Sequence, residues 1–79
     1  MDSNTFNKNL LIIARQARKM SQASLARKTG LTQGFLSKVE NGLTEPSEDA
    51  VQKFVDVLSF PKSFFYQSER THHRAAQGW

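Results

Sequence analysis

Residues 21–42, SQASLARKTGLTQGFLSKVENG, decide the fold of this chain. The hydroxyl of Ser21 can accept from the unpaired amides of a first helical turn, so a helix is expected to begin there. Gly30 is expected to end that helix, because glycine adopts a left-handed backbone at no steric cost. Thr32 is the next expected N-cap. The stretch therefore predicts two short helices joined by a tight turn.

The second of these helices, expected over residues 33–41, has two chemically different faces. At about 100° of rotation per residue, Phe35, Leu36 and Val39 cluster on one side. The other side carries amide, hydroxyl and ammonium groups that suit base edges in a DNA groove, and a glycine that permits close approach. A solvated helix face has a similar composition, so the face alone leaves both interpretations open. Its members are Gln33, Gly34, Ser37, Lys38 and Asn41.

A spaced pattern across this stretch resembles a known family. The pattern S-Q-x-x-L-A-x-K-x-G-L-T-Q-x-x-L-S-K-V-E-N-G-x-x-x-P-S, from Ser21 to Ser47, is similar to that of the lambda-repressor-like (Cro/C1-type, XRE family) helix-turn-helix DNA-binding domains. The resemblance extends over about residues 7–60. It implies an all-α fold of five helices, with the second and third forming the helix-turn-helix. It also implies a regulator of transcription that binds double-stranded DNA, with repression favoured.

The same resemblance implies a salt bridge that braces the recognition helix, which is the helix expected over residues 33–41. Arg15, in the first helix, is expected to form a salt bridge with Glu40. The alternative is an exposed arginine with a weak surface bridge, worth about 0 to 1 kcal/mol.

Roles on the polar face follow from the resemblance in the same way. Gln22, at a helix N-terminus, is expected to meet a phosphate and to support Gln33, which can offer its amide to an adenine edge. Lys38 can donate to guanine or hold a phosphate, and both remain open. Because Gly34 has no side chain, either Phe35 partly turns to a thymine methyl or specificity there is weak; we favour Phe35 as mainly core. The expected DNA-binding residues are Gln22, Thr32, Gln33, Gly34, Phe35, Ser37, Lys38 and Asn41.

Charge is distributed unevenly along the chain. Residues 1–40 have a net charge of +5, whereas residues 41–69 have a net charge of −3. The basic half coincides with the two motif helices, as expected for a surface that meets phosphates, although a solvated surface or nonspecific RNA binding would look the same. After Gly42 the chain carries Leu43, Thr44 and Glu45, where relatives often have basic phosphate contacts. Less affinity is therefore expected from that loop.

Length and composition limit the class of protein. A chain of 79 residues makes one small domain, which buries only about 60% of its unfolded surface and gains from dimerisation or from membership of a longer chain. The absence of cysteine excludes disulfides and cysteine-ligated zinc. The longest apolar run, residues 10–14, is too short for a span of about 20 residues, so a soluble, cytoplasmic protein is expected. The DNA binding that the resemblance implies makes it nucleoid-associated. No catalytic set or phosphate-binding glycine loop is evident, and we expect no enzyme, cofactor or metal.

Flanking segments complete the expected domain, over residues 6–67. A first helix is expected over residues 6–19, capped by Asn4 or Thr5, and a fourth over residues 48–59, capped by Ser47. The fourth has an amphipathic stripe at helical spacing. Pro61 is expected to end it and to open a short fifth helix. The stripe consists of Val51, Phe54, Val55 and Leu58.

Aromatic residues cluster near the end of the chain. Phe60, Phe64, Phe65 and Tyr66 lie within seven residues, too many for all to be buried in so small a domain. Phe64, Phe65 and Tyr66 are therefore the expected dimer or docking surface. Residues 68–79 show no periodicity and are expected to form a flexible tail, in which the adjacent His72 and His73 lack metal-ligand spacing.

Three functions remain open. The favoured one is a regulator that acts as a homodimer on a palindromic operator. The second is the DNA-binding or interaction domain of a longer protein, an ImmA/IrrE-type peptidase or an antitoxin. The third is a helical domain that binds only proteins. No membrane or small-molecule partner is expected.

Overall fold

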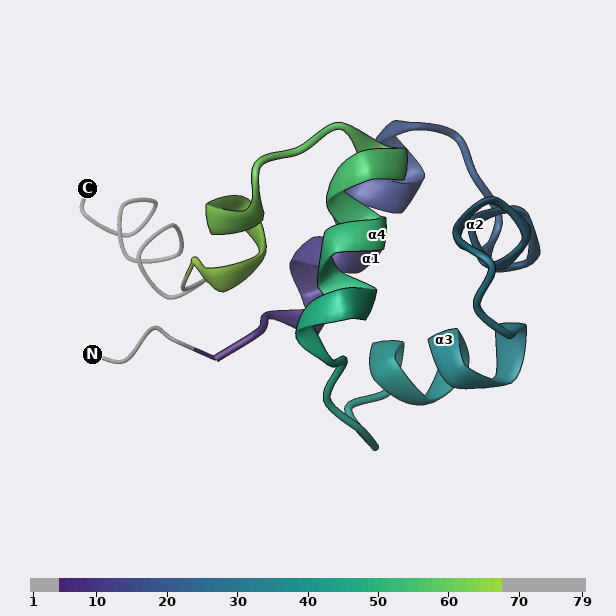
Figure 1. Cartoon of the computed structure of the whole chain (residues 1–79), viewed down its shortest axis with the longest axis horizontal. Helices are drawn as coiled ribbons and strands as arrows, with labels where there is room; N and C mark the ends of the chain where they lie inside the picture. The colour runs from purple at the N-terminus through teal and green to yellow at the C-terminus, as the bar shows by residue number, and fades with distance from the viewer. Residues whose placement is uncertain (1–4, 68–79) are drawn as a thin grey trace, which may run out of the picture.

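Four α-helices and one 3-10 helix make up residues 5–67, the part of the chain that this computed structural model describes (Figure 1). In chain order they are α1 (Lys8–Ala17), α2 (Gln22–Thr29), α3 (Gln33–Glu40), α4 (Glu48–Leu58) and η1 (Lys62–Tyr66). The all-α class is confirmed, but the fifth α-helix was wrong. Over residues 62–66 the chain takes the tighter 3-10 form, in which the Phe64 amide donates to the Pro61 carbonyl at 3.0 Å, because short segments accommodate this winding. No helix within residues 5–67 is long and apolar enough to cross a membrane.

Side-chain caps determine where the helices begin. The hydroxyls of Ser21, Thr32 and Ser47 accept from amides three residues ahead, at 3.0 to 3.1 Å, as the sequence predicted. The predicted caps Asn4 and Thr5 were wrong for α1. There the Asn7 side chain accepts from the Asn9 amide at 3.0 Å, so α1 starts at residue 8.

Asn7 also joins the two ends of the described chain. Its backbone amide donates to the Phe65 carbonyl at 2.7 Å, and its side-chain nitrogen donates to the Gln67 carbonyl at 3.0 Å. Residues 5–7 therefore lie beside η1, on the left in Figure 1.

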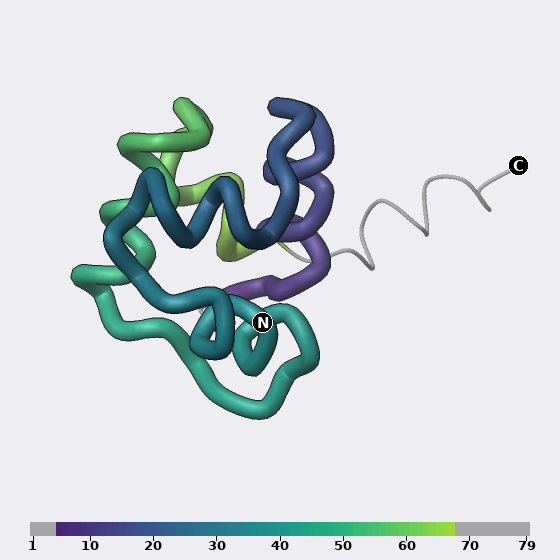
Figure 2. The backbone as a smooth tube through the Cα atoms, turned by 90° about the vertical axis from the view of Figure 1, so that its right-hand side faces the viewer, coloured from purple at the N-terminus to yellow at the C-terminus, as the bar shows by residue number. Residues whose placement is uncertain are grey.

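The core lies where the helices meet. α2 packs against α3 and α4, and α1 packs against α3, α4 and η1. Figure 2 shows α3 and the loop after it along the lower edge of the domain. The predicted stripe on α4 is confirmed for its three most buried members, and Val55 is half-buried. The largest fully buried side chains are Phe54, Phe65, Leu11, Leu25, Leu36, Leu58, Val39 and Val51.

The buried state of Phe65 contradicts its assignment to a surface. Its ring stacks 5.8 Å from that of Phe6 and is fully covered. Phe64 and Tyr66, on either side of it, are half-buried and pack against the same core. A 3-10 helix turns every three residues, so only one of three consecutive side chains points fully inward.

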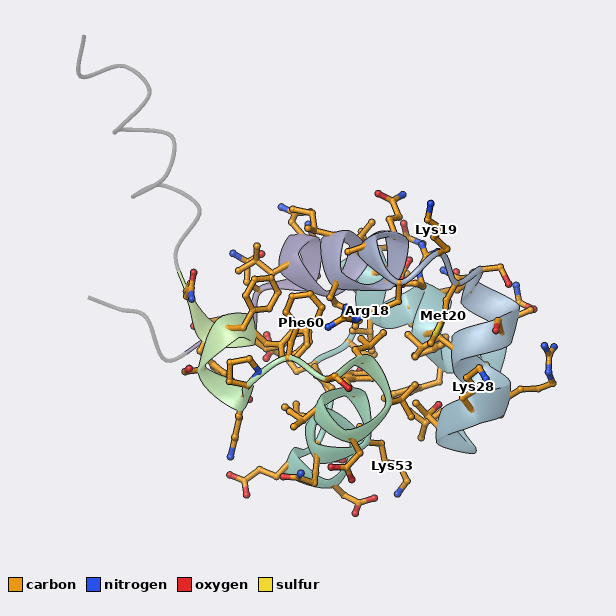
Figure 3. The ribbon with its side chains drawn as sticks, turned by 90° about the horizontal axis from the view of Figure 1, so that it is seen from above. Arg18, Lys19, Met20, Lys28, Lys53 and Phe60 are labelled. Carbon is orange, nitrogen blue, oxygen red and sulfur yellow. The ribbon has the colours of Figure 1, made fainter. Side chains whose placement is uncertain are left out.

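Arg18 connects the end of α1 to the end of α4. Its Nε donates to the Leu58 carbonyl at 2.7 Å, and its guanidinium lies 4.6 Å from the centre of the Phe60 ring (Figure 3). Carbonyls at a helix C-terminus lack partners within the helix, and a cation is favourable there. One cation of the basic half is therefore occupied by contacts within the protein, although Arg18 is exposed.

Candidate nucleic-acid interface

The outward face of α3 carries the polar residues predicted from the sequence. Gln33, Gly34 and Lys38 are exposed, and so is Asn41, which caps the helix C-terminus; Ser37 is half-buried. A methyl group placed on Gly34 would have no neighbour within 4 Å, so packing within residues 5–67 does not require a glycine at this position.

Behind this face, α3 is held by apolar contacts. Leu36 and Val39 are buried, and Phe35 is half-buried against the core, where we expected it mainly to lie. The two faces of α3 therefore separate as predicted, with a buried side packed against α1 and α2 and an open side away from them.

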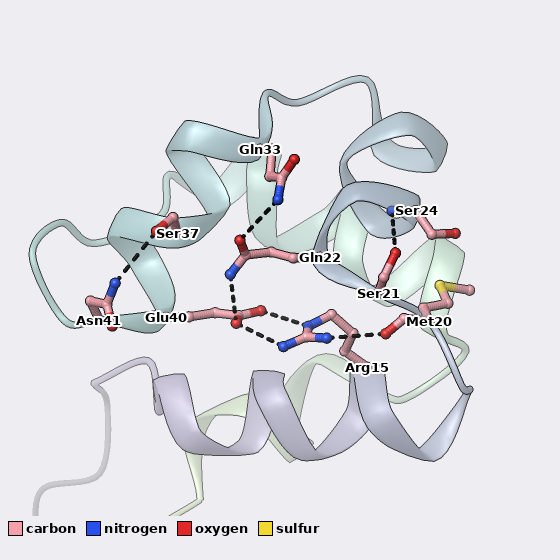
Figure 4. Close-up of polar contacts among 9 residues, drawn as sticks. All are labelled: Arg15, Met20, Ser21, Gln22, Ser24, Gln33, Ser37, Glu40 and Asn41. Atoms are coloured by element: carbon pink, nitrogen blue, oxygen red, sulfur yellow. Dashed lines mark hydrogen bonds and ion pairs between the residues drawn. The ribbon is translucent and has the colours of Figure 1, made fainter.

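An ion pair fastens the end of α3 to α1. Arg15 Nε donates to one oxygen of Glu40 at 2.9 Å, and Arg15 Nη2 donates to the other at 3.0 Å (Figure 4). The side chains are only 14% and 6% exposed. This bidentate, largely buried pair differs from a flexible surface salt bridge, because two parallel hydrogen bonds and the surrounding packing fix the guanidinium and carboxylate groups relative to each other. Arg15 Nη1 also donates to the Met20 carbonyl at 3.1 Å, a backbone partner that side-chain patterns do not indicate.

Glu40 also anchors a chain of amides that leads to the open face. The Gln22 nitrogen donates to a Glu40 oxygen at 3.0 Å, and the Gln33 nitrogen lies 3.5 Å from the Gln22 oxygen, a long and weak contact. Figure 4 shows the four residues in sequence, from the buried pair to Gln33. The contact between Gln22 and Glu40 was not expected.

Glu40 sets the direction of this chain. An ionised carboxylate only accepts, so Gln22 must turn its NH2 group toward Glu40 and its oxygen toward Gln33. Gln33 then meets Gln22 through an N–H and keeps its own oxygen and a second N–H available. Those two groups form the acceptor and donor pair that matches the N6 and N7 atoms of adenine.

Three further predicted residues lie around this centre. The Thr32 hydroxyl is exposed while it caps α3, and the Asn41 side-chain nitrogen donates to the Ser37 hydroxyl at 3.4 Å. The Lys38 ammonium has no acceptor within residues 5–67. These groups lie on or next to the outward side of α3.

Metal-binding groups are not gathered in the described part of the chain. Residues 5–67 contain no group of three or more His, Asp or Glu side chains arranged to hold a metal ion. His72, His73 and the rest of the expected tail lie outside the described residues.

Burial raises the pKa of Tyr66, and the carboxylates of Glu48 and Glu45 raise it further, but this phenol is in η1 rather than on α3.

The fold and the site together define a helix-turn-helix protein: α2 and α3 meet through a capped tight turn, and α3 shows an open polar face. The helix-turn-helix family HTH_3 matches residues 11–65. The chain belongs to this family, as the sequence pattern predicted. No curated protein sequence matches it.

Solved structures of similar fold include bacterial regulators. The restriction-modification controller protein C.AhdI from Aeromonas hydrophila has a TM-score of 0.71 at 25% identity, covering 75% of this chain and 89% of that one. The N-terminal DNA-binding domain of SinR from Bacillus subtilis has a TM-score of 0.73 at 24% identity, covering 77% and 90%. SinR, a master regulator for biofilm formation, in complex with DNA has a TM-score of 0.69 at 28% identity, covering 72% and 95%.

Proposed function

We propose that this chain is a transcription regulator that binds double-stranded DNA sequence-specifically and inserts the outward face of α3 into the major groove. The observation that carries the proposal is the line from the Arg15–Glu40 pair through Gln22 to Gln33. The firm contacts in this line orient Gln22, and the long Gln22–Gln33 contact then favours one direction of the Gln33 amide before DNA binds. Membership of the helix-turn-helix family and the likeness to SinR bound to DNA support the same function.

Each residue on the face then has a distinct task. Gln33 contacts an adenine edge, and Gln22 meets a phosphate at the N-terminus of α2. Lys38, Ser37 and Thr32, on or next to the same side of α3, contact bases or phosphates. Asn41, at the C-terminal end of α3, contacts the sugar-phosphate backbone of the DNA. Gly34 lets the helix approach the groove closely, and Phe35 stays with the core.

We further propose a homodimer on an inverted repeat, with half-sites about one helical turn apart. A single α3 of eight residues contacts few base pairs, so specific binding gains from a second copy. Phe64 and Tyr66 are the candidate dimer surface that remains after the burial of Phe65. Repression is the proposed output, because occupancy of a promoter alone can exclude polymerase.

Selection of bound sequences from a random duplex pool tests the function directly. The full chain is incubated with the pool at about 0.15 M salt, and its oligomeric state is measured at the same concentration. An enriched inverted repeat bound by a dimer is expected. Enrichment of a single half-site by a monomer contradicts the dimer alone, whereas no enrichment contradicts sequence-specific binding and favours a protein-interaction domain.

A further inference from the structure

The turn after α3 lacks the basic residues that a phosphate-contacting loop needs. Residues 43–45 are Leu, Thr and Glu, and the Leu43 side chain is 74% exposed. At this end of the recognition helix, the loop itself offers DNA no cation.

The structure brings a cation there from another part of the chain. Gly42 has a φ of +77°, and a methyl group placed on it would lie 2.9 Å from Cε and 3.3 Å from Cδ of Lys8. The end of the Lys8 side chain thus crosses the backbone of this turn. α1 begins below the end of α3 that carries Asn41, as Figure 4 shows. Lysines commonly bury the stem in this way and keep the ammonium in water.

Structural reasons for a lysine at this position are weak. Lys8 is the first residue of α1, where the helix dipole opposes a positive charge. Its ammonium has no hydrogen-bond or ion-pair partner among residues 5–67. The last turn of α3 does not need it as a cap, because the Gly42 and Leu43 amides already donate to the Val39 and Lys38 carbonyls at 3.1 and 2.8 Å.

We propose that Lys8, together with the Asn41 side chain, binds a phosphate of the DNA backbone next to the turn after α3. Lys8 supplies the charge and Asn41 supplies a neutral donor from its exposed amide. The α1 lysine thereby replaces the cation that residues 43–45 do not provide. This inference rests on the proposed DNA-binding function and adds a backbone contact to it.

The effect of one phosphate contact on salt dependence can be predicted. Each phosphate neutralised on duplex DNA contributes about −0.9 to the slope of log affinity against log salt. Removing the Lys8 charge should make the slope less negative by about 0.9 per bound chain. If the variant and the unmodified chain have equal affinities when extrapolated to about 1 M salt, the variant should bind about fivefold more weakly at about 0.15 M salt. Sequence preference should stay the same, because phosphates carry no sequence information.

The experiment uses the full chain and the duplex that the unmodified chain selects from a random pool. Lys8→Met removes the charge but keeps a flexible stem over Gly42, and Lys8→Arg keeps the charge. The matched control is Lys62→Met, at an exposed lysine in η1 that likewise has no partner within residues 5–67. Binding is measured between about 0.05 and 0.3 M salt, and thermal unfolding is measured for each variant.

The contact is supported if the slope of log affinity against log salt falls in magnitude by about 0.9 in Lys8→Met and is unchanged in Lys8→Arg and Lys62→Met. An unchanged slope in Lys8→Met overturns it while DNA binding stands, and so does a lower melting temperature without a change in slope. An equal loss of slope in Lys62→Met also overturns it, since the effect would then be one of net charge. If the unmodified chain selects no duplex, the proposed function fails first and this contact fails with it.

Discussion

Removing Arg15 is the change that should most disturb both stability and DNA binding. Arg15 donates to both oxygens of Glu40 and to the Met20 carbonyl. In Arg15→Ala the Glu40 carboxylate, 6% exposed, keeps Gln22 as its one remaining side-chain donor among residues 5–67. Breaking a buried pair costs about 3 to 5 kcal/mol, and the 14% exposure of Arg15 favours the lower end of that range.

A loss of about 3 kcal/mol is large for a domain of this size. At about 4 to 8 °C for each kcal/mol, the melting temperature should fall by about 12 to 24 °C. Total stability for 79 residues is about 4 to 12 kcal/mol, so the variant should keep about 1 to 9 kcal/mol and still fold, with a reduced margin. Affinity for the selected duplex, measured below the melting temperature of the variant, should also fall, because Arg15 no longer positions the Glu40 carboxylate to which Gln22 donates.

Two further variants make the measurement decisive. Lys53→Ala breaks the exposed Lys53–Asp49 pair on α4, whose side chains are 39% and 79% exposed, and should cost less than about 1 kcal/mol. Arg15→Met combined with Glu40→Leu removes both charges and should recover most of the stability, because no buried charge is left unpaired. If Arg15→Ala lowers the melting temperature no more than Lys53→Ala does, the ion pair is not a brace.

Three other changes test the face, the caps and the aromatic end. Gln33→Ala should reduce discrimination at one base pair by about 1 to 3 kcal/mol, measured by repeating the duplex selection; an unchanged preference would show that Gln33 does not contact a base. Ser47→Ala removes the cap of α4 and should lower the melting temperature by about 4 to 8 °C, for a loss of about 1 kcal/mol; an equal effect of Ser63→Ala, at a position without a cap bond, would contradict this. Because the pKa of Tyr66 is raised in the folded state, the unfolded chain releases that proton first, so its contribution to stability is present below about pH 10 and is lost at higher pH. Tyr66→Phe should therefore lose less stability than the unmodified chain between pH 9 and 11 in thermal unfolding, and identical losses would refute the effect.

Features that depend on neighbours in sequence could be predicted. A cap needs only its own side chain and an amide three residues ahead, so Ser21, Thr32 and Ser47 were recognisable. The start of α1 was not, because Asn4, Thr5 and Asn7 are all suitable caps. Contacts of Asn7 with residues 65 and 67, distant in sequence, accompany the observed start.

The site was predictable in its residue types but not in its connections. Glu40 lies 25 residues from Arg15, and the family resemblance implied their pairing where spacing alone could not. Nothing in the sequence indicated that Gln22 also donates to Glu40. Net charge likewise does not locate side chains: Arg18, counted with the basic half, turns toward the Leu58 carbonyl. Lys8 reaches the turn after α3 only because of how the helices pack.

The junction that Asn7 makes with Phe65 and Gln67 has a practical consequence for handling the protein. The two ends of the coloured ribbon in Figure 1, which this junction joins, lie on the side of the domain opposite α2 and the start of α3. A fluorophore attached next to residue 5 or residue 67 therefore begins its path away from Gln33. A short peptide should also suffice to join residue 5 to residue 67, so that the domain can be reopened within a surface loop as a circular permutant.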